Sequence, residues 1–303
     1  MIEVMHNRMH GHLENHVFGG HSVENVLRFV KLLMERMSRD DMTSYAAALA
    51  YKFLFALFPL VLFLTALLGF MHLPTTIKDI VGPLNSLVPA SVITLLRSAI
   101  AVAIHHENPT VLSLGIVGFV WGMSGAFMEL IDAFNHAYEL TYPFKRGTIK
   151  RYLLAAGTGI IFGLLFVATL LVATGGTLFT HWLLNSVLHW PIDHVASFFL
   201  HWLMLLVLLV FSLDMLYTIL PDLHLPFKFL SPGTILATAV FIVLAWGFSL
   251  YTSHFDSYNK MYGSLGTVIL LLLYLYLFAL AILLGAEVNA LLYHQRHKSS
   301  QKK

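Results

Sequence analysis

The chain has 303 residues, of which 58% are hydrophobic and 11% are charged, and it contains no cysteine. A soluble domain carries about 25% charged residues, so this composition excludes an ordinary soluble domain. The lack of cysteine excludes disulfides, thiolate nucleophiles and thiolate metal sites. The net charge of +2 gives no indication of nucleic-acid binding, and we expect none.

The N-terminal region precedes the first long apolar stretch. Residues 1–21 are polar and rich in histidine and glycine, which predicts a disordered tail and not a metal site. Residues 22–44 place apolar side chains at helical spacing and predict a cytoplasmic amphipathic helix. Two placements are open for it: the inner membrane surface, or the protein's own cytoplasmic loops. The region lacks the pattern of a cleavable signal peptide, so the first span is expected to be an uncleaved anchor.

Six apolar stretches follow, and each is long enough to cross the roughly 30 Å hydrocarbon core as a helix. They lie at about 46–70, 111–135, 152–174, 197–220, 232–254 and 264–292. Residues 75–106 show helical spacing interrupted by Pro83 and Pro89, which predicts an external helical lid. The predicted fold class is all-α: a polytopic bundle of six transmembrane helices over 45–293, followed by a basic cytoplasmic tail at 294–303.

The distribution of basic residues predicts the orientation. With a cytoplasmic N-terminus, 14 of the 18 basic residues lie on the inner side and 3 on the outer side. The positive-inside rule therefore favours both termini in the cytoplasm.

Five charged residues lie within the predicted spans: Lys52, Glu129, Asp132, Asp214 and Glu287. The other four charged residues, without Asp132, come from four different helices. At a helical rise of 1.5 Å per residue, each of them lies roughly 10 Å inside the cytoplasmic boundary. Charged side chains in the bilayer usually face a bundle interior or a water-filled cavity. Lys52 is expected to be the only cation available to these acids, so at least two of them are expected to be protonated, hydrated or paired elsewhere.

The second span carries small and acidic residues on one helical face. Gly115, Gly118, Gly122 and Gly125 predict close approach of another helix, and Glu129, Asp132 and His136 continue the same face. We therefore expect a polar cavity open to the cytoplasm and closed outward. Two alternatives are open: Lys52 snorkels to the interface, and Asp132 and His136 lie in headgroup water. The cavity candidates are Lys52, Glu129, Asp132, Asn135, Asp214, Glu287 and Asn289.

Several motifs in order along residues 25–293 resemble the YihY/BrkB family of bacterial inner-membrane proteins, also grouped as UPF0761. They are DDMTSYAAALAYKFLFALFPL at 40–60, AFNHAY at 133–138, SPG at 231–233, SYNKMYGSL at 257–265 and LGAEVN at 284–289. Lys52 departs from the family, where an uncharged residue is more usual. The resemblance implies a six-helix protein of the bacterial inner membrane without a settled activity.

The family once carried a ribonuclease BN label, and these residues argue against an enzyme. The acids lie in membrane helices, and the sequence offers no basic aromatic platform for RNA. No P-loop, HExxH or G-x-S-x-G motif is present. We expect no cofactor, and the sequence does not indicate an oligomeric state.

The sequence favours a transporter-like protein that moves or hands over an amphiphile such as a lipid. Anionic headgroups of membrane lipids would meet the basic residues Lys145, Arg146, Lys150 and Arg151 at the inner surface. An external loop would form the outer gate with Asp256, Tyr258, Asn259, Lys260, Tyr262 and Gly263. The alternatives are a membrane scaffold for an envelope protein partner and an ion-coupled exporter of a small molecule.

Overall fold

The computed structural model describes residues 22–70, 109–140, 146–182, 194–223, 225–253 and 256–300. These ranges contain seven helices and no strand. The helices are α2 (Ser22–Arg39), α3 (Met42–Phe70), α6 (Pro109–Ala137), α7 (Thr148–Trp182), α8 (His194–Ile219), α9 (Pro232–Ser253) and α10 (Asp256–Ser300). The predicted tail at 1–21 and the predicted lid at 75–106 lie outside the described residues, as does Lys145.

The helices from α3 to α10 coincide with the six predicted spans. Within the described residues, five of them are long and apolar enough to cross a membrane, while α9 has a shorter apolar stretch, Pro232–Phe248. The predicted all-α membrane bundle is therefore confirmed. One expectation was wrong: residues 256–263, predicted as an external loop, form the first two turns of α10. This helix of 45 residues is about 68 Å long and extends well beyond a hydrocarbon core.

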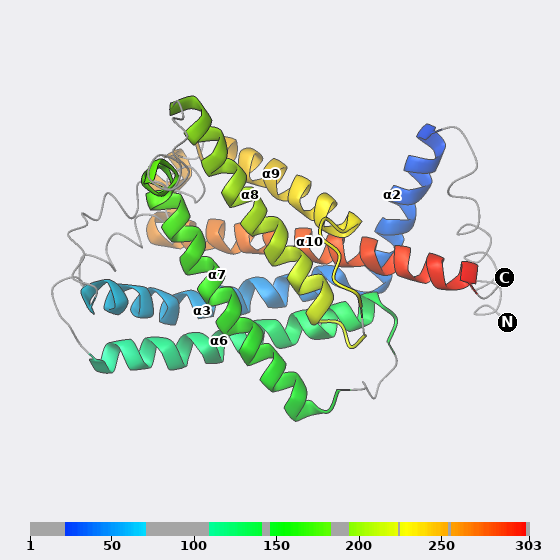
Figure 1. The fold of residues 1–303 in the computed structure, drawn as a ribbon, viewed down its shortest axis with the longest axis horizontal. Helices are drawn as coiled ribbons and strands as arrows, with labels where there is room; N and C mark the ends of the chain where they lie inside the picture. The colour runs from blue at the N-terminus through cyan, green and yellow to red at the C-terminus, as the bar shows by residue number, and fades with distance from the viewer. Residues whose placement is uncertain are drawn as a thin grey trace.

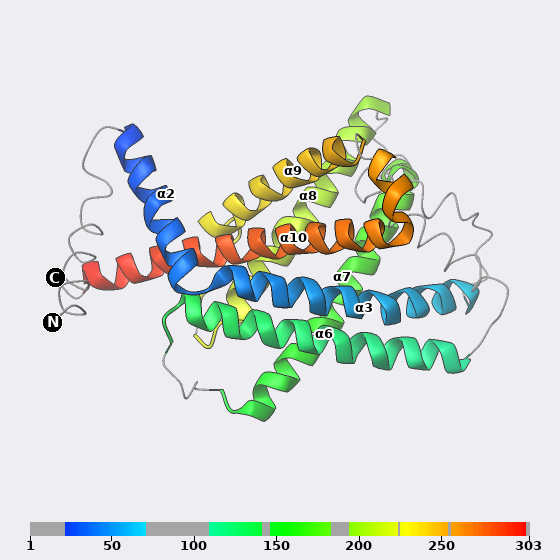
Figure 2. The same ribbon diagram turned by 180° about the vertical axis from the view of Figure 1, so that it is seen from behind.

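Three long helices, α3, α6 and α10, form the centre of the bundle, with α3 packed against both of the others. In Figures 1 and 2, α7 crosses this group at a steep angle, α8 packs on α7, and α9 packs along α10. The buried core lies where these helices meet and includes Leu49, Phe127, Phe134, Leu220 and Leu283.

The glycine face of α6 packs against α3, as predicted. A Cβ at Gly115 would lie 2.6 Å from the backbone nitrogen of Phe63, and one at Gly122 would lie 3.2 Å from Ala56. Small residues at this face allow the two helix backbones to approach closely. The close contact ends at Gly125, where an added Cβ would meet nothing within 4 Å.

Helix α2 runs across the direction of α10 at one end of the bundle, hereafter the α2 end (Figures 1 and 2). Leu32 and Leu33 on this helix are buried, whereas Leu27, Val30 and Met34 are exposed. One face of α2 therefore packs on α3 and α10 while a second apolar face is uncovered, and the placement of this face on the inner membrane surface stays a prediction. The predicted orientation identifies the α2 end with the cytoplasmic side.

Candidate functional site

The charged residues predicted to form one layer are divided among separate contacts at the α2 end. Lys52 of α3 donates a hydrogen bond to Glu129 of α6, and Arg151 of α7 donates one to Asp132 of α6. The expectation that Lys52 was the only cation available to the acids was wrong. It treated Arg151 as a surface residue, but α7 begins early enough to place this side chain against α6.

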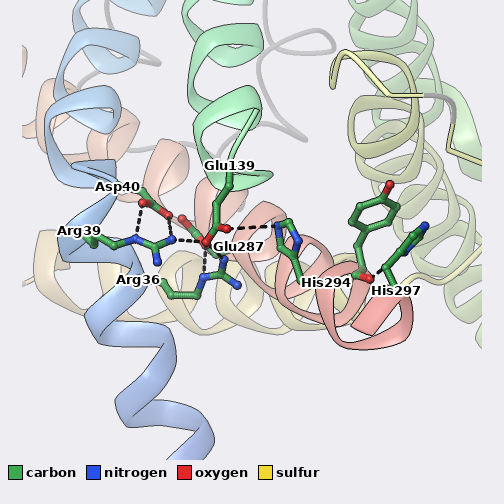
Figure 3. A network of polar contacts seen from close by, with 8 residues as sticks. Arg36, Arg39, Asp40, Glu139, Glu287, His294 and His297 are labelled. Carbon is green, nitrogen blue, oxygen red and sulfur yellow. Dashed lines mark hydrogen bonds and ion pairs between the residues drawn. The ribbon is translucent and has the colours of Figure 1, made fainter. Parts of the chain in front are cut away.

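A second group of charges joins α2, the end of α6 and α10 (Figure 3). Arg36 donates to Glu139 at 2.5 Å, and Arg39 donates to the same carboxylate oxygen at 2.7 Å. The Nε atom of Arg36 lies 3.8 Å from Oε2 of Glu287. Arg36 is 4% exposed and Glu287 is 0% exposed, so this pair is shielded from water. Within the described part of the chain, the Glu287 oxygens accept no hydrogen bond.

Glu139 lies at a strained position of the backbone just after α6. Its φ of 54° is in the left-handed region, which glycine usually occupies at a helix end. The amides of Glu139 and Leu140 donate to the carbonyl oxygens of His136 and Asn135 at 2.8 and 2.9 Å, which closes the helix. The turn therefore aims a carboxylate at two arginines of α2.

The pKa of Glu139 predicts how pH affects the attachment of α2. Partial burial raises this pKa, but the charge of Arg36 and the hydrogen bond and charge of Arg39 outweigh it, so the net shift is downward from 4.5. A carboxyl with a lowered pKa stabilises the fold above its ordinary pKa, and the contribution is lost as pH falls below about 4.5. We expect Glu139→Gln to lower the free energy of unfolding at neutral pH, with the difference from the native chain shrinking below about pH 4.5. A difference that is independent of pH would contradict this assignment.

Asp214 of α8 organises a third polar group, at the start of α9. Its carboxylate accepts hydrogen bonds from the amides of Leu230 and Ser231 at 2.8 and 3.2 Å, and from the Thr234 hydroxyl at 2.5 Å. Asp214 is buried, and Leu230 has a φ of 60°. The acid therefore fixes the turn that leads into α9.

Asn289 of α10 completes this group. Its side-chain oxygen accepts from the amide of Gly233 at 2.9 Å, and its nitrogen donates to the Ser231 hydroxyl at 3.0 Å. Beside these residues lies a cavity of about 390 Å³ between α8, α9 and α10. It has buried polar groups at its base and exposed basic residues at its mouth. The lining is Tyr138, Asp214, Tyr217, Thr218, Leu225, Pro226, Lys228, Ser231, Pro232, Asn289, Leu292, Tyr293, Arg296 and His297.

The structure brings only two of the predicted cavity residues, Asp214 and Asn289, to this cavity. Asn135 instead accepts a hydrogen bond from the amide of Asp222 at 2.8 Å and so holds the turn after α8. Of the predicted lipid-binding cations, Arg146 pairs with Asp222 and Arg151 with Asp132, whereas Lys150 is exposed. The side chains of the predicted outer gate lie outside what the structure describes.

Sequence reasoning missed the basic residues at the cavity mouth as site residues. A signal for Arg296 was available, because it lies two helical turns after Asn289 and so shares its face of α10. Lys228 carried a weaker signal, a cation between two aromatic residues, Phe227 and Phe229. Within the described ranges, no group of three or more histidine and acidic side chains is placed to hold a metal ion.

The long apolar helices and their arrangement define a multi-pass helical membrane protein. The sequence model of the family described as Virulence factor BrkB matches residues 33–303. The chain therefore belongs to the BrkB family, as its motifs indicated, and its helices fit a multi-pass protein of the bacterial inner membrane.

Curated relatives support this membership. The chain is 32% identical to a ribonuclease-like protein, YfkH, of Bacillus subtilis, over 90% of this chain and 97% of the relative. It is 28% identical to the UPF0761 membrane protein VP0125 of Vibrio parahaemolyticus, over 89% of this chain and 84% of the relative. It is 27% identical to the UPF0761 membrane protein PA0951 of Pseudomonas aeruginosa, over 86% of this chain but only 61% of that longer relative. No solved structure matches the chain significantly.

Proposed function

We propose that this protein moves or hands over an amphiphilic molecule whose polar part occupies the cavity between α8, α9 and α10. The observation that carries the proposal is the cavity itself, which combines buried polar groups with exposed cations beside apolar helices. Its volume of about 390 Å³ falls within the range of small-molecule sites. The cavity lies at the α2 end of the apolar helices, where a lipid headgroup would meet the protein.

The surface beyond the cavity favours an amphiphilic ligand rather than a fully polar one. Further along the contact between α9 and α10, a shallow hollow is lined by Phe241, Leu244, Phe248, Tyr274 and Phe278, together with Ala245 and Leu277. The ten residues from Pro232 to Phe241 span about 14 Å of α9. An apolar chain extending from the cavity along these helices would therefore reach an aromatic surface.

Filling the cavity tests the proposal. Leu225 lines the cavity and is half-buried, so we expect Leu225→Trp to occupy the space needed by the ligand. The native protein in liposomes should transfer a fluorescent lipid between leaflets, and the variant should lower this rate roughly tenfold, a barrier increase of about 1.4 kcal/mol. Leu153→Trp is the matched control, because Leu153 is exposed on α7 and does not line the cavity. Equal rates for the native protein and Leu225→Trp would contradict the proposal.

The exposed face of α2 favours a second candidate, a scaffold that docks an envelope partner. Leu27, Val30 and Met34 are 65%, 46% and 69% exposed and recur at helical spacing. The triple substitution of these residues by serine should release a docked partner but leave lipid transfer unchanged. Loss of lipid transfer in this variant would count against a separate docking role.

A further inference from the structure

The mouth of the cavity carries positive charge that has no acidic partner among the residues that the structure describes. Lys228 comes from the turn before α9, Arg296 comes from α10, and both are exposed at the mouth. No carboxylate among the described residues pairs with either of them. Three other arginines at the α2 end do have such partners: Arg36 with Glu139, Arg146 with Asp222, and Arg151 with Asp132.

Asp214 is the acid among the described residues that line the cavity, and its carboxylate is not free to pair with these cations. Both carboxylate oxygens of Asp214 already accept hydrogen bonds, three in all, from the turn into α9. Lys228 and Arg296 therefore share the cavity with one acid whose oxygens are occupied, and His297 also lines the mouth. The balance favours an anionic ligand.

Most of the neutral polar groups of the cavity wall already form hydrogen bonds within the protein. The Tyr217 hydroxyl donates to the carbonyl oxygen of Ile282 at 2.9 Å. The Asn289 amide is held by Gly233 and Ser231. A ligand is consequently recognised mainly by the ammonium group of Lys228 and the guanidinium group of Arg296. A guanidinium binds phosphate oxygens in pairs, and an ammonium group adds a compact charge.

The aromatic residues beside Lys228 place this cation near lipid. Phe227 and Phe229 flank it in sequence, and each is 53% exposed. Aromatic side chains next to basic residues are typical of the membrane interface, where phosphate groups lie. The ring of Phe227 also lies 6.3 Å from that of Phe211 on α8, so this turn contacts the apolar helices.

We propose that the cavity binds a phosphate ester, with the phosphate held between Lys228 and Arg296 at the mouth. This inference rests on the proposed function, because it names the ligand class of the same cavity. The phosphate ester belongs either to a lipid headgroup or to a soluble molecule, and both sources present the same group to the two cations.

The test compares ligands that differ only in the phosphate. Purified, delipidated full-length protein is mixed with phosphatidic acid or with diacylglycerol of the same chains, and bound lipid is measured by native mass spectrometry. We expect phosphatidic acid to bind more tightly. Lys228→Gln and Arg296→Gln should each weaken its binding roughly tenfold, and the double variant roughly a hundredfold. Lys31→Gln is the matched control, because Lys31 is exposed but does not line the cavity.

A competition arm distinguishes the two sources of the phosphate. Displacement of phosphatidic acid by glycerol 3-phosphate would support a site for soluble phosphate esters, and failure to displace it would support a lipid site. Equal binding of phosphatidic acid and diacylglycerol, or no effect of the double variant, would overturn the inference. In that case, a loss of lipid binding in Leu225→Trp would still support the proposed function, whereas unchanged binding in Leu225→Trp would count against both.

Discussion

Replacing Arg36 by methionine is expected to lower the free energy of unfolding by about 3–5 kcal/mol, because it leaves a buried carboxylate without its counter-charge. Glu287 is fully buried, and the Arg36 Nε atom at 3.8 Å is its cationic contact among the described residues. The same change also removes the 2.5 Å hydrogen bond to Glu139. Unfolding in mixed detergent micelles, followed by tryptophan fluorescence, measures the loss.

A double variant separates charge from packing in this prediction. Arg36→Met with Glu287→Leu removes both charges and keeps the apolar volume, so most of the lost stability should return. Lys31→Met is the control, since Lys31 is largely exposed and its ion pair within the described ranges is with Glu35, at 4.0 Å. That change should alter stability by less than about 0.5 kcal/mol. A loss in Arg36→Met no larger than in Lys31→Met would indicate that Glu287 is held as the neutral acid.

Gly285→Ala is expected to cost about 3 kcal/mol, at the upper end of overpacking effects. A Cβ at Gly285 would lie 2.7 Å from the carbonyl oxygen of Gly233 and would also collide with the Tyr217 hydroxyl. The first of these atoms belongs to the backbone of α9, so relief requires α9 and α10 to separate. Because Asn289 holds Gly233 one turn further along, the cavity wall should be disturbed as well.

Gly125→Ala provides the matched control for this prediction. Gly125 also lies inside an apolar helix, but an added Cβ there meets nothing within 4 Å. Alanine has the better helix propensity, so this variant should gain up to about 1 kcal/mol. Adding Tyr217→Phe to Gly285→Ala removes the hydroxyl contact but not the contact with Gly233, and should restore only part of the stability. Equal stability of the two single alanine variants would contradict the close approach of α9 and α10.

The helices could be predicted because membrane spans obey a local rule. A run such as 268–297 has to be helical in lipid to satisfy its own backbone hydrogen bonds, whatever surrounds it. The packing face of α6 was also local information, since Gly115 and Gly122 recur at helical spacing and small residues permit close contact. The same rule failed at 256–263, where polar residues suggested a loop although the backbone continues as helix.

The partners of the charged residues could not be predicted from neighbouring positions in the sequence. Lys52 and Glu129 are 77 positions apart, and Arg36 and Glu139 are 103 apart, so helix rotation and register decide whether they meet. The shared depth of the acids suggested one layer, but depth does not fix direction around the bundle. Glu129 faces α3, Asp132 faces α7, and Asp214 turns toward the start of α9.

By itself, the sequence determined the membrane class, the helical spans, the family and the presence of polar groups at the α2 end, because hydropathy and helical spacing are properties of contiguous residues. Only the tertiary structure decided that Lys228, Arg296 and Asn289 meet around one cavity while Arg36 and Glu287 form a buried pair. The physical reason is that a cavity or an ion pair arises where separate helices cross, and the crossings depend on side-chain packing along their whole length.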